Sequence, residues 1–317
     1  MSKLSESTSH GAPVQITLKS ATGSHPVIAC FPGSFAPGAR NEKHDPRPWY
    51  RCREYLLGGW GQHEVWRSAV VEGMASLMLV FVAGQIAGTL SAYQTKFIGV
   101  YIGVSNIFLI SLFIFATAPA SGGHINPVIT FSTILCGICP VSRGVLYMIF
   151  QIAGAALAGG VLRGVWGLEL ARTYHGGGGC FFDNHTTTAG RVYLNEVMST
   201  FSLLFLSYGV GLDPRQAVLS GPKFGPFLVG ASLGLVSFAS SGMIPGYGGA
   251  QMNPGRCFAY AIAQGDFSYH WIWWFGPAVG GIIQAIMYNS VPPFHAHESS
   301  APVETSPPTE TERSGSV

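Results

Sequence analysis

Residues 248–256 read Gly-Gly-Ala-Gln-Met-Asn-Pro-Gly-Arg, and residues 121–128 read Ser-Gly-Gly-His-Ile-Asn-Pro-Val. They lead into two short apolar segments, Asn126 to Ile138 and Asn253 to Ala263. At a helical rise of about 1.5 Å per residue, such segments reach only about half of a bilayer core. Asn and Pro are preferred residue types at the N-cap and first position of a helix. The pattern predicts two half-helices that enter a membrane without crossing it.

The composition is typical of a polytopic membrane protein. Only 10% of the residues are charged and 48% are hydrophobic, whereas roughly a quarter of a typical soluble domain is charged. Six further stretches, of about 20 apolar residues each, are long enough to cross a bilayer. They are Ser68 to Thr89, Phe97 to Ala118, Gly144 to Leu162, Val192 to Leu212, Phe224 to Met243 and Tyr269 to Asn289. We therefore expect an all-α membrane protein.

An internal repeat organises these segments. Glu72 precedes Asn126 by 54 residues, and Glu196 precedes Asn253 by 57. Each half holds three spans, an odd number, so the halves are expected to form an inverted repeat, over about 67–165 and 191–290. Irregular backbone at membrane depth needs a protein-lined or water-filled cavity. The half-helices thus imply a cavity where their positive dipole ends meet, which disfavours protons and cations.

The two Asn-Pro stretches resemble the paired signatures of the aquaporin (major intrinsic protein) family, and the resemblance extends from about residue 66 to 289. It implies an aquaporin-like bundle of six transmembrane helices plus two re-entrant half-helices, with an aquaporin-type channel domain at 67–290. The pore-signature residues would be Asn126, Pro127, Val128, Asn253, Pro254 and Gly255. With Val in the first motif and Cys257 directly after Arg256, the chain is most similar to the X-intrinsic protein subfamily.

In aquaporins, four positions line an outer constriction, the selectivity filter. Offsets from the two motifs place them at Asn106, Ser241, Ala250 and Arg256. Water-selective members have Phe and His at the first two positions, whereas this chain has smaller side chains there. The resemblance therefore implies a passive channel for glycerol, urea, hydrogen peroxide or boric acid, with water as a further permeant, that excludes protons and ions.

The sequence pattern also leaves other functional classes to consider. A strict water-selective aquaporin is the main alternative. A coupled secondary transporter would need midplane carboxylates coupled to substrate, whereas Glu72 and Glu196 fit the family's structural pattern and are expected to accept hydrogen bonds from the re-entrant loop backbones; proton relay is the alternative. No catalytic constellation converges at one depth, so no enzyme is expected. No cofactor, metal site or nucleic-acid partner is expected either, and the resemblance implies a homotetramer in a lipid bilayer.

The third residues of the motifs differ from Ala in opposite directions, since Val128 is larger and Gly255 is smaller. One hypothesis is a volume-conserving pair in which Val128 fills space that Gly255 vacates. The alternative is two independent substitutions.

Several polar residues keep two interpretations. His124 either braces the loop or responds to pH. The six cysteines do not suggest a disulfide framework. Cys257 is then either a target of oxidation or mercurials beside the filter, or a packing residue. Cys136 and Cys139 form a C-x-x-C that is expected to pack between helices.

Lys and Arg concentrate on the side of both tails, which the positive-inside rule assigns to the cytosol. Residues 1–66 and 291–317 are expected to be cytosolic tails, largely disordered, and the plasma membrane is the expected location. The loop between spans three and four then lies outside, and its sequon at Asn184 is a glycosylation candidate.

Overall fold

The computed structural model describes residue 50, residues 52–213 and residues 217–291. The outer parts of both expected tails, 1–49 and 292–317, lie outside the described residues. Part of the expected N-terminal tail is ordered, because α1 spans Arg53–Leu57 and its Tyr55 is fully buried. The Tyr55 hydroxyl donates to the carbonyls of Ile134 and Cys139, at 2.8 and 2.6 Å. The short α1 is thereby fastened to the end of the first half-helix.

Helices dominate the described part of the chain, where the one β-bridge joins Phe182 and Tyr247. The elements of the first half are α2 (His63–Ala92), α3 (Ile98–Ser121), α4 (Pro127–Leu135) and α5 (Val141–Thr173). Those of the second are α6 (Ala189–Ser207) with the π-helix η2 (Tyr208–Leu212), α7 (Ala217–Ser240), α8 (Pro254–Gln264) and α9 (Ile272–Ser290). The order of two long helices, one short helix and one long helix occurs twice.

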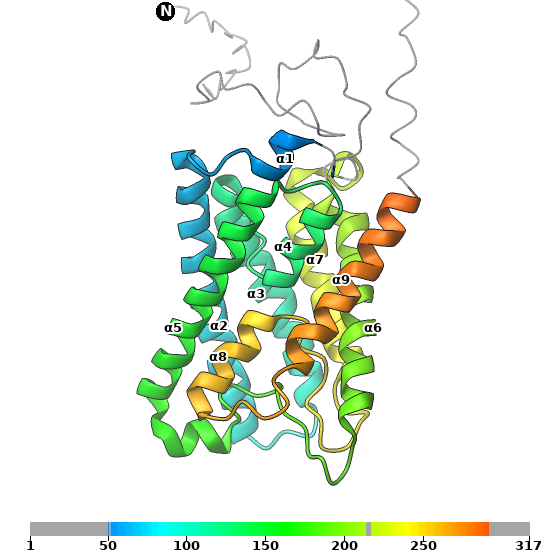
Figure 1. Cartoon of the computed structure of the whole chain (residues 1–317). Helices are drawn as coiled ribbons and strands as arrows, with labels where there is room; N and C mark the ends of the chain where they lie inside the picture. Colours follow the sequence, from blue (N-terminus) through cyan, green and yellow to red (C-terminus); the bar gives the residue numbers. More distant parts are fainter. Residues whose placement is uncertain (1–49, 51, 214–216, 292–317) are drawn as a thin grey trace, which may run out of the picture.

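All six predicted spans and both predicted half-helices coincide with helices. By length and hydropathy, α2, α3 and α5 can each cross a membrane. The helices α6 and α9 have 19 residues each, or about 28 Å at the helical rise. The main difference is α5, which continues beyond the predicted Leu162 to Thr173 and has a non-helical Gly167 inside it. Figure 1 shows α4 and α8 in opposite ends of one bundle, and α2 begins at the end where α9 finishes.

Close helix crossings hold the bundle together. A Cβ atom at Gly154 of α5 would overlap the carbonyl oxygen of Gly73 in α2, and one at Gly159 would overlap the carbonyl of Ala259 in α8. Side chains at these glycines would therefore push the backbones apart. Small residues allow helices to approach in this way in membranes, where lipid supplies no hydrophobic drive for association.

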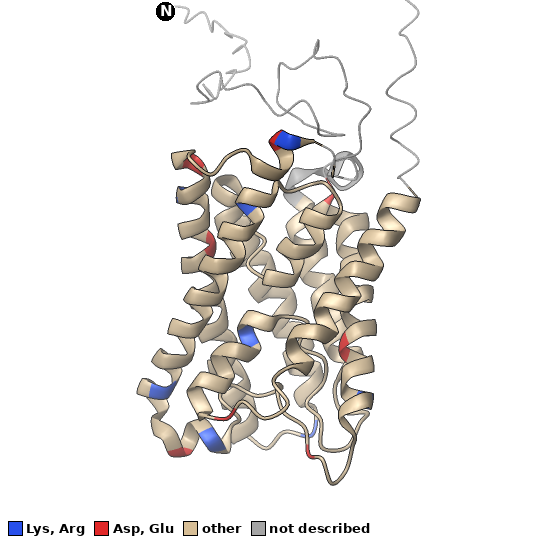
Figure 2. Cartoon of the chain, in the orientation of Figure 1, with Lys and Arg blue, Asp and Glu red and all other residues tan. Residues whose placement is uncertain are grey.

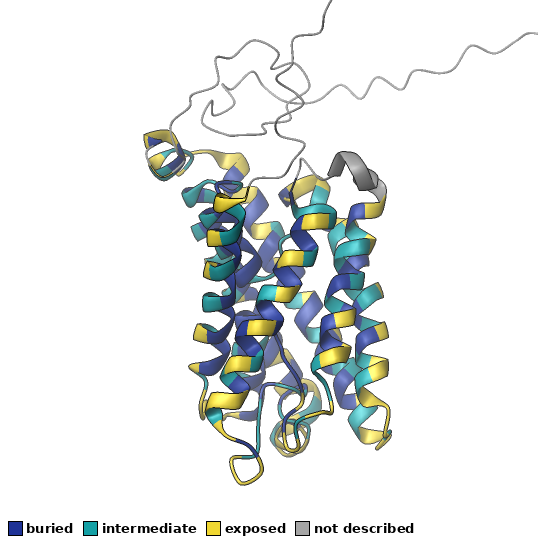
Figure 3. Cartoon of the chain, turned by 90° about the vertical axis from the view of Figure 1, so that its right-hand side faces the viewer, coloured by how far each residue is buried: buried dark blue, intermediate teal, exposed yellow. Residues whose placement is uncertain are grey.

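The outer surface of the bundle suits a bilayer. Large apolar side chains such as Phe108, Leu112, Leu157 and Phe275 are exposed, and exposed residues lie on the outward faces of the helices (Figure 3). Charged residues gather toward the two ends, and only a few lie along the length of the bundle (Figure 2). An apolar belt between two polar ends is the arrangement expected of a membrane-spanning protein.

Candidate pore

Asn126 and Asn253 occupy equivalent positions at the starts of the two half-helices. The Oδ1 atom of Asn126 accepts a hydrogen bond from the Val128 amide at 3.0 Å, and that of Asn253 accepts one from the Arg256 amide at 3.1 Å. Each oxygen satisfies an N–H group that a helix start leaves without an intrahelical partner. Because the oxygens are used for capping, the carboxamide nitrogens face the space between the helices as donors.

The residue before each Asn has a left-handed backbone, with φ of 49° at Ile125 and 51° at Met252. Such conformations cost on the order of 1–3 kcal/mol for residues with side chains, so the surrounding contacts must enforce them. One such contact joins the two loops, because Nδ2 of Asn126 donates to the Met252 carbonyl at 2.9 Å. A carboxamide nitrogen carries two hydrogens, so this bond leaves Asn126 a second N–H.

The carboxylate of Glu72 in α2 accepts hydrogen bonds from the first loop. Its Oε1 accepts from the His124 amide at 3.0 Å and from the Ser121 hydroxyl at 2.6 Å. Its Oε2 accepts from the Ile125 amide at 2.6 Å and from Nε2 of Gln151 at 2.9 Å. These four donors surround a fully buried carboxylate, which explains how a charge is accommodated in the bundle.

Glu196 of α6 has the same relation to the second loop. Its Oε1 accepts from the Gln251 amide at 2.8 Å and the Tyr247 hydroxyl at 2.9 Å, and its Oε2 accepts from the Met252 amide at 3.0 Å. In both halves, a carboxylate therefore binds the amides of the two residues that precede the signature Asn. Both carboxylates accept hydrogen bonds from loop amides and from neighbouring side chains, which are the contacts expected of structural residues.

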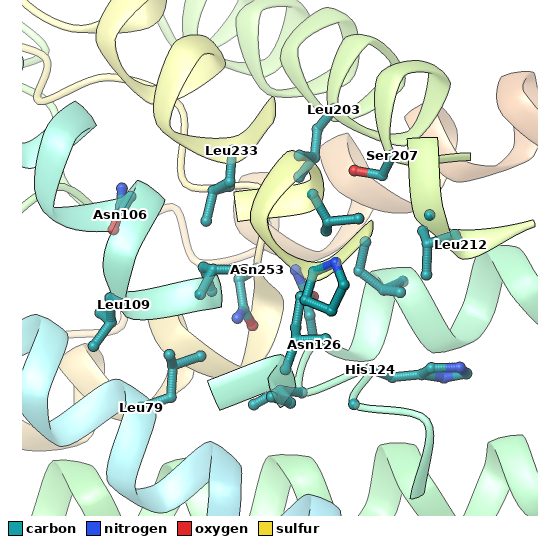
Figure 4. Close-up of a pocket in the computed structure, with 18 of the residues that line it drawn as sticks. Leu79, Asn106, Leu109, His124, Asn126, Leu203, Ser207, Leu212, Leu233 and Asn253 are labelled. Atoms are coloured by element: carbon teal, nitrogen blue, oxygen red, sulfur yellow. The ribbon is translucent and has the colours of Figure 1, made fainter. Parts of the chain in front are cut away.

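A cavity of about 290 Å³ lies between the two halves. Both signature Asn residues line it, and Figure 4 shows them close together among leucine side chains from several helices. Its walls are mostly apolar, with Leu79, Val80, Ile110, Leu203, Val229 and Leu233 among them. Polar groups are contributed by Asn106, His124, Ser207, Gln251 and Arg256. A cavity with a few fixed polar groups on apolar walls suits small polar solutes without charge.

The expected filter residues divide into two pairs in the structure. Asn106 of α3 and Arg256 of α8 both line the cavity. Ala250 is buried beside Leu203 and Met252, and Ser241 follows the last residue of α7; neither is among the residues lining this cavity. The Ser241 hydroxyl donates to the Ser237 carbonyl at 2.6 Å, so it is directed back along the helix.

Arg256 is oriented by a residue one turn further along α8. Its Nε donates to the Tyr260 hydroxyl at 2.9 Å, and its guanidinium carbon lies 5.4 Å from the centre of the Tyr260 ring. The Tyr260 side chain is fully buried, so the acceptor is fixed in place. The offsets from the motifs did not find Tyr260, although its i, i+4 spacing from Arg256 on a helix is a usable signal.

The expectation that no disulfide is present was wrong for Cys257. Cys257 is bonded to Cys180, 77 residues earlier in the chain, with Cα atoms 5.4 Å apart. Cys257 is therefore not a free thiol beside the filter. The loop that contains Gly176 to Gly179 folds against α8, where a Cβ at Gly176 would overlap the Tyr260 carbonyl. That contact between distant segments brings the two cysteines together. Cys136 and Cys139 are buried and form no disulfide bond.

The atoms nearest to a Cβ at Gly255 belong to residues other than Val128. A Cβ atom at Gly255 would lie 3.4 Å from the Pro127 ring and 3.5 Å from Ala155. Val128 instead lies near Gly281 of α9, where a Cβ would be 3.6 Å from its Cγ2 atom. The nearest neighbours thus differ at the two positions, and the volume-conserving pair stays a prediction.

Two further predicted residues, His124 and Asn184, have different surroundings. The ring nitrogen Nδ1 of His124 is 3.2 Å from the Thr130 hydroxyl, and the ring packs edge-on against Tyr147. These contacts are those of a loop-bracing residue that also lines the cavity. Asn184 is exposed in the loop between α5 and α6, where glycosylation stays a prediction.

Comparison with known proteins agrees with this geometry. The family model "Major intrinsic protein" matches residues 59–288. Among curated relatives, the chain is 31% identical to a probable aquaporin TIP4-1 of Oryza sativa subsp. japonica over 227 residues, which cover 68% of this chain and 83% of that protein. It is 32% identical to aquaporin TIP2-1 of Arabidopsis thaliana, over 61% of this chain and 72% of that protein.

Solved structures include a similar fold. The aquaglyceroporin from Plasmodium falciparum superimposes with a TM-score of 0.54 at 20% sequence identity. The match covers 71% of this chain and 96% of that one. At this level of identity, the likeness concerns the fold.

Proposed function

Because the chain belongs to the major intrinsic protein (aquaporin) family, we propose that it is a passive channel for glycerol, urea, hydrogen peroxide and boric acid, with water as a further permeant. Proteins of this family are membrane channels and not enzymes. The observation that carries the solute range is the side chain that α3 contributes to the cavity wall, Asn106. Asn is smaller than the Phe of water-selective members, so it leaves room for solutes larger than water.

Exclusion of protons and ions follows from the paired helix starts. The half-helices α4 and α8 each direct an N-terminus, which carries a partial positive charge, toward the cavity. Arg256 adds a full positive charge to the same wall. Cations are repelled by these groups, and any ion would lose its hydration on apolar walls. Neutral solutes avoid both costs.

The competing function is a strict water-selective channel. The two TIP proteins compared above are named as aquaporins, whereas the superimposed structure is named as an aquaglyceroporin. The absence of Phe at position 106 favours the wider solute range.

Val128 and the Arg256–Cys257 sequence support assignment to the X-intrinsic subfamily. We also propose that the protein is a homotetramer in the plasma membrane, with cytosolic termini and the channel domain at 67–290.

Stopped-flow light scattering on proteoliposomes tests the proposal. Water, glycerol and urea fluxes are measured while an internal pH dye follows protons, and we expect rapid glycerol or urea flux without proton leak. Leu233→Trp places an indole in the cavity and should abolish flux. The matched control is Leu235→Trp, because Leu235 is 59% exposed on the outer face of the same helix. Fast water flux with no solute flux would instead establish the water-selective alternative.

A further inference from the structure

The part of the cavity wall that α6 and η2 form carries a hydroxyl group, that of Ser207. Leu203, Ser207 and Gly211 all line the cavity, and they follow one another at intervals of four residues, which places them on one face of the segment. Figure 4 shows Ser207 between Leu203 and Leu212 on this wall. Ser207 is therefore the polar side chain that this described segment brings to the cavity, among apolar neighbours.

The Ser207 hydroxyl is not used within the protein. A serine in a helix commonly donates to the carbonyl four residues earlier, and Ser202 of α6 does so to Met198 at 2.8 Å. Ser207 is fully buried, yet its hydroxyl has no hydrogen-bond partner in the described part of the chain. A buried hydroxyl without a partner costs free energy. Because Ser207 lines the cavity, a molecule that passes through can supply the partner.

Contacts on the far side of this segment fix its orientation. The next residue, Tyr208, is buried, and its hydroxyl lies 3.0 Å from that of Ser132 in α4. Its ring packs edge-on against Tyr288 of α9, with ring centres 5.2 Å apart. The Tyr288 hydroxyl in turn donates to Oδ2 of Asp213, directly after η2, at 2.9 Å. These contacts hold the segment against α4 and α9, so Ser207 stays on the cavity side.

Ser207 lies well away from Arg256 and the expected filter. Glu196 of α6 binds two amides of the second loop, and Ser207 is 11 residues further along the chain. At the helical rise this separation is about 16 Å. The wall near Ser207 is completed by Gly225 of α7, where a Cβ would lie 3.6 Å from the Cα atom of Gly211. Ser207 thus belongs to a different stretch of the cavity from the expected filter.

We propose that Ser207 forms a second solute-binding station, which takes small neutral solutes that carry hydroxyl or amide N–H groups. This inference rests on the proposed function. A hydroxyl both donates and accepts, so it can bind a polyol in either sense and can accept from urea. A solute larger than water displaces the waters around it, so groups on the wall must replace its lost hydrogen bonds. Water in the cavity bonds to neighbouring waters, and its flux therefore depends less on Ser207.

The first test is the ratio of glycerol to water permeability in proteoliposomes for wild type, Ser207→Ala and Ser202→Ala. Both fluxes come from the same vesicles, so any unfolded fraction cancels in the ratio. Ser207→Ala should lower the ratio about fivefold, as expected for one lost hydrogen bond. Ser202→Ala is the matched control, because Ser202 is exposed on the same helix, and it should keep the wild-type ratio. An unchanged or higher ratio in Ser207→Ala would mean that Ser207 only occupies space, and would overturn the inference.

A cysteine pair tests whether position 207 faces the solute path. Ser207→Cys and Ser202→Cys are treated with methyl methanethiosulfonate, a small neutral reagent that transfers a methylthio group to a thiol. We expect treatment to block water and glycerol flux in Ser207→Cys. It should leave flux unchanged in Ser202→Cys and in wild type, which carry the same native cysteines. Unchanged flux in treated Ser207→Cys would also overturn the inference.

Glycerol and urea flux through the wild-type protein tests the proposed function separately. If wild type passes water alone, the proposed function fails, and the solute station fails with it. If wild type conducts glycerol and Ser207→Ala keeps the wild-type ratio, the inference about Ser207 fails alone.

Discussion

The disulfide between Cys180 and Cys257 fastens the loop after α5 to the residue that follows Arg256. Cys257 lies in the first turns of α8, directly after the cavity-lining Arg256. The bond therefore restrains the start of a half-helix whose backbone amide also binds Asn253. Through this covalent link, the loop after α5 and the cavity wall form one unit.

Reduction of this disulfide should lower stability. A disulfide typically contributes about 2–5 kcal/mol by restricting the unfolded chain. Thermal unfolding of the detergent-solubilised protein, followed with and without reductant, should show a lower midpoint in reductant, and Cys180→Ser should have the lower midpoint in both conditions. Cys136→Ser is the matched control, because Cys136 is a buried cysteine outside any disulfide bond; the sensitivity of this variant to reductant should equal that of wild type. Equal midpoints for oxidised and reduced wild type would contradict the prediction.

The carboxylate of Glu72 is expected to be essential to the first loop. Glu72→Gln replaces one acceptor oxygen by an NH₂ group, which faces donors that include the amides of His124 and Ile125. Each buried donor left without an acceptor costs about 1–3 kcal/mol. We expect a marked fall in thermal stability and in the yield of folded protein. Glu64→Gln on the same helix is the control, because Glu64 is exposed. Wild-type stability of Glu72→Gln would argue against a structural carboxylate.

Much of the architecture could be predicted from local patterns in the sequence. The positions of Asn126 and Asn253 as N-caps follow from residue types within one helical turn, so they could be predicted without knowledge of the fold. The spans follow from apolar length. The repeated Glu-to-Asn spacing also indicated which carboxylate belongs to which loop, because both members of each pair lie in one half of the repeat.

Contacts between segments far apart in the sequence were harder to predict. Cys180 meets Cys257 because a run of glycines with positive φ angles folds the loop after α5 over α8. The amino-acid composition does not specify that path. The offset to the second filter position runs through the irregular residues 241–252 and reaches Ser241, which follows the last residue of α7 and is not among the residues that line the cavity. Its place in the filter stays a prediction.

Two adjacent glycines of α5 should respond differently to the same substitution. A Cβ at Gly159 would overlap the Ala259 carbonyl, whereas Gly160 has open space around it. Gly159→Ala should destabilise the bundle by about 1–3 kcal/mol, as overpacking does elsewhere. Gly160→Ala should be neutral or stabilising by up to about 1 kcal/mol, because Ala favours helix over Gly. Thermal unfolding of the two variants compares them directly, and similar midpoints would mean that α5 and α8 are less closely packed than described.

The hydroxyl of Tyr260 is expected to sharpen the selectivity of the pore. It accepts from Nε of Arg256 at 2.9 Å, and Tyr260→Phe removes this acceptor while keeping the buried ring. Arg256 should then sample other orientations, so the channel should discriminate less between solutes of different size. We expect the ratio of erythritol to glycerol flux to rise about threefold to tenfold, in keeping with the loss of one charge-assisted hydrogen bond. Tyr174→Phe is the control, since Tyr174 directly follows α5 and its ring packs against Trp166 of that helix. An unchanged ratio in Tyr260→Phe would show that Arg256 is held by the backbone of α8 alone.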